Sequence, residues 1–230
     1  MHLSRVTVAT QTLNRHALLN LMAGDAYSNH QLLWRLFTDQ PQRNFLFRQE
    51  IEQEQLSGAS SRGLPLFYVL STEPPNDVPG LLETQTKPFE PKLNRGDALA
   101  FKLRANPTVA RKREGHRNSA RHDVLMDAKV QCRRDNIITP DEQANPMNSA
   151  AIAWLDERAE QAGFQLVSAP QVTGYRQHSV ARRDREIRFS SVDYDGLLTV
   201  LDPEVFKQTL GCGLGHSRAF GCGLLMIRRA

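Results

Sequence analysis

The sequence predicts an α+β protein built from two similar halves, each with the element order βαββαβ. Stretches with the apolar patterns of strands are interleaved with helix-like stretches. The order strand, helix, strand, strand, helix, strand runs through the chain twice, with the second helix of the first half poorly marked. A chain of 230 residues is also long enough for two small domains. Because this order is that of the ferredoxin-like split βαβ unit, we expect two tandem ferredoxin-like domains.

The first domain is expected to span residues 1–108. Its elements are a strand at 3–9, a helix at 27–37, strands at 43–50 and 64–72 and, after a proline-rich connector, a strand at 98–107. The first strand alternates apolar and polar residues, and the helix carries Leu33, Leu36 and Phe37 on one face at 100° per residue. Polar residues and glycine predict a loop at 52–63.

The second domain is expected to span residues 109–230. Its elements are a strand at 121–130, a helix at 149–163, strands at 164–172 and 185–201, a short helix at 203–210 and a last strand at 224–227. Ser149 is suited to cap the N-terminus of the first helix, because its hydroxyl can accept from a free backbone amide. The segment 135–148 is rich in polar residues, Asn and Pro and is expected to be a loop.

Positive charge is concentrated in two parts of a chain whose formal net charge is only +4. Residues 104–134 hold nine Lys and Arg against three acidic residues, and Arg182, Arg183 and Arg185 cluster where a turn between two strands is expected. A run of charge is usually a solvated face. Two such clusters favour a polyanionic partner, because Lys and Arg that neutralise phosphates release counterions and supply most non-specific affinity for nucleic acid.

Composition gives no sign of a membrane, a disulfide or a metal. The chain has no run of 18 apolar residues and no signal-peptide pattern, so we expect a cytoplasmic protein without a membrane partner. The cysteines Cys132, Cys212 and Cys222 are odd in number and lack C-x-x-C spacing, which favours reduced thiols over disulfides or zinc. We expect neither a bound metal nor a cofactor.

The glycine-rich segment 211–225, "GCGLGHSRAFGCGLL", raises a separate question. A dinucleotide fingerprint would need a following helix and an acidic residue about 20 residues later, and the chain ends before that. The segment also lacks the Gly-Lys-Ser/Thr of a nucleoside triphosphate site. Two interpretations remain: a loop that presents Ser217, Arg218 and its amides to a phosphate, or a tight structural turn before a last strand.

Four stretches together carry a resemblance to a known family: "MHLSRVTVA", "YSNHQLLWRLF", "FKLRANPT" and the C-terminal "GLLTVLDPEVFKQTLGCGLGHSRAFGCGLLMI". In order and spacing they resemble the CasE/Cse3 family, the repeat-processing CRISPR endoribonucleases of type I-E Cascade complexes. The resemblance implies two ferredoxin-like domains and metal-independent cleavage of repeat stem-loops in precursor crRNA, leaving a 2′,3′-cyclic phosphate. It implies as partners the repeat RNA hairpin, before and after cleavage, and other Cascade subunits, including the backbone subunit.

The helix at 27–37 carries the candidate catalytic pair. His30 lies on the shoulder of the apolar face, one turn from Tyr27, so both side chains can reach one substrate atom. Histidine exchanges a proton near neutral pH, and the family's Y-x-x-H motif falls on the same two residues. We assign proton transfer to His30 and positioning or a secondary proton role to Tyr27, without deciding which is acid and which is base. The alternative is a structural histidine beside apolar neighbours.

The RNA-binding candidates lie in the basic clusters and the glycine-rich segment. They are Arg104, Arg111, Arg113, Arg182, Arg183, Arg185, Gly213, Gly215, Ser217 and Arg218. The arginines at 182–185 match the position of a basic hairpin in the family. Two other functions stay open: a non-catalytic subunit that only holds an RNA hairpin in a larger assembly, and an unrelated RNA-binding protein of the same fold.

Overall fold

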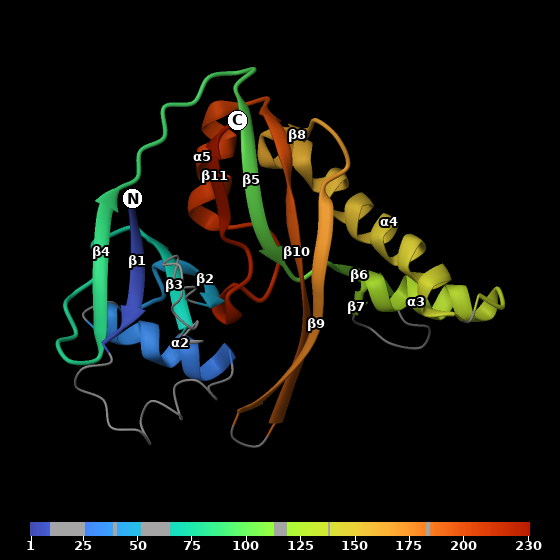
Figure 1. Cartoon of the computed structure of the whole chain (residues 1–230), viewed down its shortest axis with the longest axis horizontal. Coiled ribbons are helices and arrows are strands. Elements are labelled where there is room, and N and C mark those ends of the chain that lie inside the picture. Colours follow the sequence, from blue (N-terminus) through green and yellow to red (C-terminus); the bar gives the residue numbers. More distant parts are fainter. Residues whose placement is uncertain (10–25, 39–40, 52–64, 113–118, 138, 183–184) are drawn as a thin grey trace, which may run out of the picture.

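Two antiparallel sheets lie side by side in the chain, each with helices against it (Figure 1). The structure is a computed structural model and describes residues 1–9, 26–38, 41–51, 65–112, 119–137, 139–182 and 185–230. No helix among these residues is long and apolar enough to cross a bilayer. The predicted α+β class, with two sheet-forming halves, is confirmed at this level.

The first sheet has the strand order β2-β3-β1-β4, and every neighbouring pair is antiparallel. Its elements are β1 (His2–Val8), α2 (Ala26–Trp34), the 3-10 turn η1 (Arg35–Phe37), β2 (Phe45–Ile51), β3 (Pro65–Ser71) and β4 (Leu82–Pro88). The predicted strands and helix are confirmed. Between β3 and β4 the described chain forms no helix, and the adjacent Pro74 and Pro75 explain this because proline lacks an amide donor. Sequence reasoning missed β4, an edge strand whose residues are mostly exposed.

The second sheet has the strand order β11-β5-β10-β8, and β9 also pairs with β10. Its strands are β5 (Ala98–Ala105), β8 (Phe164–Leu166), β9 (Gln171–Arg182), β10 (Arg185–Val200) and β11 (Leu225–Arg229). Its helices are α4 (Pro140–Ala159), extended by the 3-10 turn η2 (Glu160–Ala162), and α5 (Pro203–Cys212). A third 3-10 turn, η3 (Arg218–Phe220), lies in the glycine-rich segment. The long β9–β10 hairpin extends beyond the sheet on the side of α2 (Figure 1).

The division between the sheets does not coincide with the expected boundary at residue 108. Strand β5 was expected to close the first domain, but it pairs with β10 and β11 in the second sheet. The reason is packing: Leu99, Phe101 and Leu103 of β5 are buried in the core under α4 and α5. The change from one sheet to the other therefore falls in residues 89–97.

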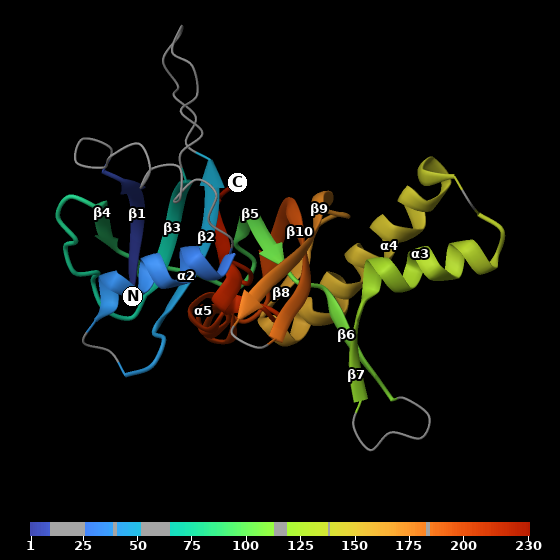
Figure 2. The same cartoon turned by 90° about the horizontal axis from the view of Figure 1, so that it is seen from below.

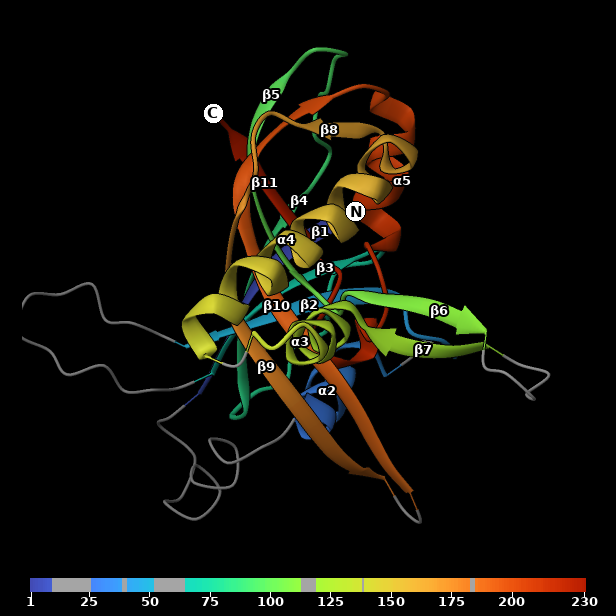
Figure 3. The same ribbon diagram turned by 90° about the vertical axis from the view of Figure 1, so that its right-hand side faces the viewer.

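The predicted strand at 121–130 is wrong, because most of that segment forms the helix α3 (Val124–Arg134). Asp123 starts the helix: its carboxylate accepts from the amides of Leu125 and Met126 at 2.8 and 3.3 Å. The residues before α3 form a two-stranded ribbon, β6 (Thr108–Lys112) and β7 (Ser119–Asp123). Figures 2 and 3 show this ribbon standing away from both sheets.

The helix predicted at 149–163 begins nine residues earlier than expected, so the segment 140–148 is helix and not loop. Its N-cap is Thr139 and not Ser149, and Pro140 occupies the first turn, where a missing amide donor costs nothing. Asp141 and Glu142 follow, and their charge suits the positive end of the helix dipole. Start signals at 139–142 therefore outweigh Pro146, which lies inside the helix.

Each sheet has its own apolar core, and a small cluster joins them. The first core packs Leu33, Leu36 and Phe37 of α2 and η1 against the strands of the first sheet, which confirms the predicted buried face. The joining cluster holds Leu46 and Leu70 of the first sheet and Leu224 beside β11. The two sheets are therefore in direct contact where β2 and β3 approach the end of the glycine-rich segment.

Candidate functional site

A cleft of about 470 Å³ lies where α2, the first sheet, the second sheet and the glycine-rich segment meet. One wall is formed by Ala26, Phe47, Gln49 and Glu50, the other by Arg104, Arg176, Gln177, His178, Ser179, Val180 and Ser191, and Phe220 and Gly221 close one end. Residues from all four parts of the chain thus line one space. The turn η3 packs against α2, the helix that carries Tyr27 and His30.

The imidazole of His30 is held among aromatic rings. Its ring centroid lies 5.6 Å from that of Trp34, 5.8 Å from Phe45 and 6.4 Å from Phe47. His30 and Tyr27 are both partly exposed, one turn apart on α2. Packing therefore fixes the orientation of His30 while part of the residue stays accessible, which suits a group that exchanges a proton with a bound molecule.

The glycines at 213 and 215 are required by packing inside the protein. A Cβ on Gly213 would lie 2.9 Å from Leu46 Cδ1, and one on Gly215 would lie 3.1 Å from Trp154 Cη2, both at positive φ. Several amides of the segment donate to backbone carbonyls, such as Gly213 to Thr209 and Leu214 to Gly223. Packing therefore explains both glycines as parts of a structural turn, and phosphate contact by Gly213 and Gly215 stays a prediction.

Ser217 and Arg218 brace the same segment from within. Arg218 donates through Nε to the carbonyl of Gly215 at 2.9 Å and through Nη1 to the carbonyl of Cys212 at 2.7 Å. Ser217 has a left-handed backbone (φ 56°), and its hydroxyl accepts from Asn106 Nδ2 at 2.7 Å. These bonds hold both residues beside α2 and the end of β5.

Arg43, just before β2, adds a second cation near Arg218, and sequence reasoning missed it. Its Nη1 is buried and has no hydrogen-bond partner within the described chain. Burial, and then the charge of Arg218, lower the pKa of the Arg43 guanidinium. An anion placed between them would offset this repulsion. No sequence pattern marks Arg43, because its proximity to Arg218 arises only in the fold.

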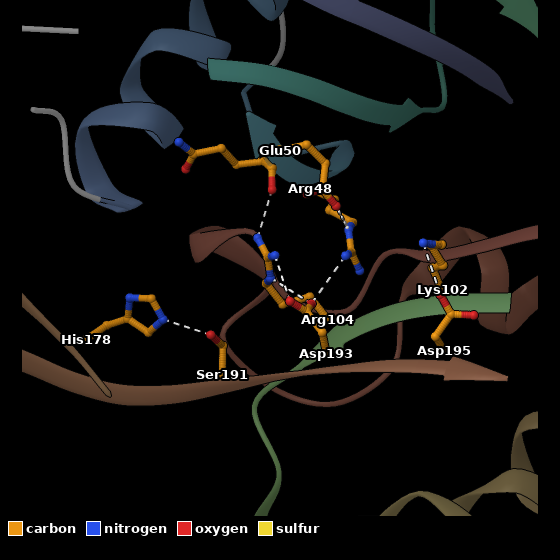
Figure 4. Close-up of polar contacts among 9 residues, drawn as sticks. Arg48, Glu50, Lys102, Arg104, His178, Ser191, Asp193 and Asp195 are labelled. Carbon is orange, nitrogen blue, oxygen red and sulfur yellow. Dashed lines mark hydrogen bonds and ion pairs between the residues drawn. The ribbon is translucent and has the colours of Figure 1, made fainter. Parts of the chain in front are cut away.

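Arg104 makes three hydrogen bonds within the protein, so the structure gives it a structural role, and its role in RNA binding stays a prediction. Its Nε and Nη2 donate to the two carboxylate oxygens of Asp193, both at 2.9 Å, and its Nη1 donates to the carbonyl of Gln49 at 2.8 Å (Figure 4). Burial lowers the pKa of Arg104, but the hydrogen bond and charge of Asp193 outweigh it and raise the pKa overall. Asn29 of α2 in turn donates to the Gln49 side chain at 2.8 Å. Arg104 thus links the second sheet to β2, whose Gln49 side chain is bonded to α2.

The remaining arginine candidates lie on two separate projections. Arg182 and Arg185 face each other in register at the end of the β9–β10 hairpin, while Arg183 and Arg113 lie outside the described residues. Arg111 lies on the β6–β7 ribbon, where it pairs with Asp127 at 2.9 Å and stays largely exposed. Figure 3 shows the hairpin and the ribbon pointing in different directions. The ends of the hairpin strands at Arg182 and Arg185 therefore lie apart from the ribbon that carries Arg111.

In the comparisons with known proteins, the matching family model and the similar proteins are CRISPR-associated. A family model described as CRISPR associated protein matches residues 1–229. The CRISPR system Cascade subunit CasE of Escherichia coli K12 is 26% identical over 234 aligned residues, 99% of this chain and 98% of that protein. The CRISPR-associated endoribonuclease Cse3 of Thermus thermophilus is 28% identical over 152 residues, 61% of this chain and 60% of that protein. A solved structure of Thermus thermophilus Cse3, bound to an RNA representing a pre-cleavage complex, matches with a TM-score of 0.67 and 26% identity, over 99% of this chain and 98% of that one.

Proposed function

The chain belongs to the CRISPR-associated protein family that includes Cse3 and CasE, and on this basis we propose that it is an endoribonuclease that processes CRISPR RNA. Its substrate is the repeat stem-loop of precursor crRNA, and it retains the product hairpin. The observation that carries this proposal is the meeting of α2, which bears Tyr27 and His30, with η3 at a cleft between the sheets, in a chain that matches the family over residues 1–229.

The reaction follows from the chemistry of RNA. The 2′-OH attacks the adjacent phosphorus, the 5′-oxygen leaves, and a 2′,3′-cyclic phosphate remains. Such a reaction needs in-line positioning, a proton acceptor for the hydroxyl, a proton donor for the leaving oxygen and positive charge near the phosphoryl oxygens. His30 transfers a proton at one end and Tyr27 positions the reacting group or assists. Arg218, with Arg43 nearby, supplies the positive charge.

The two sheets correspond to two ferredoxin-like domains in this proposal. In the second, β5, α4, β8, β10, α5 and β11 follow one another as βαββαβ, with β9 as an added strand. The first has the corresponding strand order β2-β3-β1-β4 but no helix between β3 and β4 among the described residues. Counted in this way, the second domain begins at β5 and not at residue 109.

RNA binding is assigned to the β9–β10 hairpin and to the surface beside the cleft. Arg182, Arg183 and Arg185 reach the stem near its end, because the major groove of an RNA helix is too narrow along its length for side chains to read. Ser217 and Arg218 lie next to the cut bond, and Arg111 on the ribbon contacts phosphates farther away, as does Arg113. The protein works in the cytoplasm as one subunit of a Cascade complex, as the name of its Escherichia coli relative indicates for that protein.

The decisive experiment is incubation of purified protein with its cognate repeat RNA, followed by mapping of both new ends. We expect one cut in the repeat, a 2′,3′-cyclic phosphate on the upstream product and a 5′-hydroxyl on the other. A substrate with a 2′-deoxynucleotide at the cut position should bind but stay intact. Tight binding of the hairpin without any cut would instead identify a non-catalytic RNA-binding subunit.

Chelation gives a second prediction. Cleavage should continue at an unchanged rate in excess EDTA, because the 2′-OH is the nucleophile and no metal-bound water is required. The measurement is the single-turnover rate with and without EDTA. Loss of cleavage on chelation, restored by magnesium or manganese, would contradict this mechanism.

A further inference from the structure

A second groove, of about 790 Å³, lies next to the cleft and shares one wall with it. Its lining comes from four places: the end of β5 with β6, the end of β7 with α3, the β9–β10 hairpin, and residues 216–220 of the glycine-rich segment. Four residues, Gln177, His178, Ser179 and Phe220, line both spaces. A molecule that occupies the groove is therefore a direct neighbour of one bound in the cleft.

Three polar atoms of the groove's lining residues are buried and unsatisfied. Asn106 Oδ1, Thr108 Oγ1 and Ser190 Oγ have no hydrogen-bond partner within the part of the chain that the structure describes. Asn106 is 5% exposed and Ser190 is 4% exposed. A buried polar group without a partner destabilises a folded protein, so such groups are few in native structures. Three of them around one groove indicate a ligand that donates or accepts hydrogen bonds.

The groove has an aromatic wall, of which His178 and Phe220 are shared with the cleft. The rings of His178 and Phe189 stack with centroids 4.5 Å apart, and Phe189 stacks on Phe220 at 5.1 Å. The bond from His178 to Ser191 Oγ, 2.8 Å long, fixes one end of this column. Burial, then Arg104 and Arg176, lower the pKa of His178, which favours the neutral ring. Aromatic rings of this kind pack against nucleobases of any sequence.

The lining carries two arginines and two carboxylates, but Arg121 at its edge is in none of the described ion pairs and is available to an anion. Arg121 is exposed at its edge, and Arg188 is exposed beside it. The two carboxylates in the lining are already engaged: Glu186 pairs with Arg188 and accepts from Ser179, and Asp123 caps α3 and accepts from Tyr175 at 2.7 Å. The groove thus combines an aromatic wall, unsatisfied polar atoms and a peripheral cation.

From these three features we infer that the groove binds one unpaired nucleotide of the RNA substrate, next to the bond that is cut. This inference rests on the proposed function. The base packs against the aromatic wall, and an amino group on its edge donates to Asn106 Oδ1. The hydroxyls of Thr108 and Ser190 bond to the remaining polar atoms of the base or sugar, and Arg121 lies near the adjoining phosphate. Adenine, cytosine and guanine carry such an amino group and uracil does not.

The test is a double-mutant cycle between protein and RNA. The protein variant is Thr108→Val with Ser190→Ala, which removes two unsatisfied hydroxyls and little volume. The RNA is the cognate hairpin with unpaired nucleotides on both sides and a 2′-deoxynucleotide at the cut position, and each flanking base is removed in turn as an abasic site. We expect loss of one particular base to weaken binding to wild-type protein by about tenfold. The variant should bind the intact RNA about fivefold more weakly.

In the variant, removal of that same base should weaken RNA binding clearly less than in the wild type, because the hydrogen bonds from Thr108 and Ser190 to the base are already lost. Thermal unfolding provides a second readout: the variant should melt at the wild-type temperature or above, since no partnered hydrogen bond is removed. Ser71→Ala is the matched control, a buried serine whose hydroxyl donates to the carbonyl of Glu73 at 2.6 Å. It should lower the melting temperature and leave RNA affinity unchanged.

The outcomes separate the inference from the proposed function. If wild-type protein does not bind the hairpin, the proposed function fails. If it binds and cuts, but every abasic RNA loses the same affinity with the variant as with the wild type, the groove holds only water and the inference is overturned. A variant that binds intact RNA as tightly as the wild type overturns it as well.

Discussion

Each arginine around the cleft has a different set of neighbours, and these neighbours decide what the side chain can do. The guanidinium of Arg104 donates to the carboxylate of Asp193 and to the carbonyl of Gln49. Arg218 donates to two carbonyls of its own segment but has no carboxylate partner among the described ion pairs. Besides burial, its charge lowers the pKa of nearby Arg43. The residue type alone does not distinguish a structural arginine from one that meets a phosphate.

His30 carries the first prediction at this scale. His30→Ala should abolish cleavage and leave hairpin affinity within a few-fold, because it removes a proton-transfer group and not a phosphate contact. His30→Phe should be equally inactive while keeping the ring that packs against Trp34 and Phe45. The measurements are the single-turnover rate and the dissociation constant, with exposed Gln31→Ala as a control from the same helix. Cleavage by either His30 variant at the wild-type rate would rule out the assigned role. Tyr27→Phe should be milder, since it loses only a hydroxyl.

Arg218 carries the second prediction at the residue scale. In Arg218→Ala, single-turnover cleavage at saturating protein should fall about 10-fold or more, a barrier increase of at least roughly 1.4 kcal/mol, with little change in affinity. Arg218→Lys keeps the charge but not the two hydrogen bonds to carbonyls. Compared with the alanine variant, it should therefore cleave faster but have a similar melting temperature. Melting curves of both variants separate these effects. If the alanine variant loses affinity but cuts at the wild-type rate once saturated, Arg218 only helps to bind RNA.

At the scale of elements, two projections from the second sheet differ in their relation to the cleft. The β9–β10 hairpin contributes His178 and Ser191 to the cleft wall and extends on the side of α2, whereas the β6–β7 ribbon stands away from both sheets (Figures 1 and 2). At the end of the hairpin, Arg182 and Arg185 are opposite each other in register. In the proposed function the hairpin holds the RNA beside α2, because it extends on that helix's side of the molecule.

This arrangement predicts how the hairpin arginines act. Replacing Arg182, Arg183 and Arg185 together with alanine should weaken hairpin binding and flatten its salt dependence. Each lost phosphate contact should remove roughly 0.7 to 0.9 from the slope of log affinity against log salt. The saturated cleavage rate should stay close to that of the wild type. The measurement is the dissociation constant at several salt concentrations, combined with single-turnover kinetics.

A charge-matched control is available at the opposite end of the molecule. Arg95, Arg228 and Arg229 are exposed there, and replacing them with alanine removes the same net charge. This control should leave the salt slope nearly unchanged. Equal slopes for the two triple variants would mean that total charge, and not the hairpin, sets the affinity.

At the scale of the whole molecule, a polar network and an apolar cluster join the two sheets. Leu46, Leu70 and Leu224 form the apolar contact. Beside it, Arg104 and Arg48 both approach Asp193 (Figure 4). The backbone carbonyl of Gln49 accepts from Arg104, and its side chain accepts from Asn29 of α2. The helix that carries His30 is thereby connected to the sheet that carries the basic hairpin, so their relative position depends on this interface.

Two ion pairs on the same two strands test the interface. Arg104 and Asp193 are opposite in register and mostly buried, with side chains 20% and 22% exposed. Lys102 and Asp195 are the next such pair on that face, with side chains 62% and 51% exposed. Arg104→Ala should lower the free energy of unfolding by about 2 kcal/mol, because the part-buried carboxylate of Asp193 loses two charged hydrogen bonds and keeps only the longer contact with Arg48. Lys102→Ala should change it by less than about 0.5 kcal/mol.

Urea unfolding measures both changes, and cleavage adds a second readout. Arg104→Ala should also slow cleavage at saturating protein, since the hairpin and α2 are no longer held in one arrangement. An Arg104 variant that is as stable as the Lys102 variant would show that the network does not hold the sheets together.

Local patterns in the sequence were enough to determine the α+β class, most of the strands, the buried face of α2 and the family. Each of these depends on neighbours a few residues apart: an alternation of two, a helical period of 3.6, or a motif such as "LRANP". The sheet that β5 joins, the commitment of Arg104 to Asp193 and the packing that requires glycine at 213 and 215 were decided only by the tertiary structure. The same holds for the groove, which brings Asn106, Ser190 and Phe220 together from distant parts of the chain. The physical reason is that strand pairing, burial and ion pairing depend on which distant residues meet, and local periodicity carries no information about that choice.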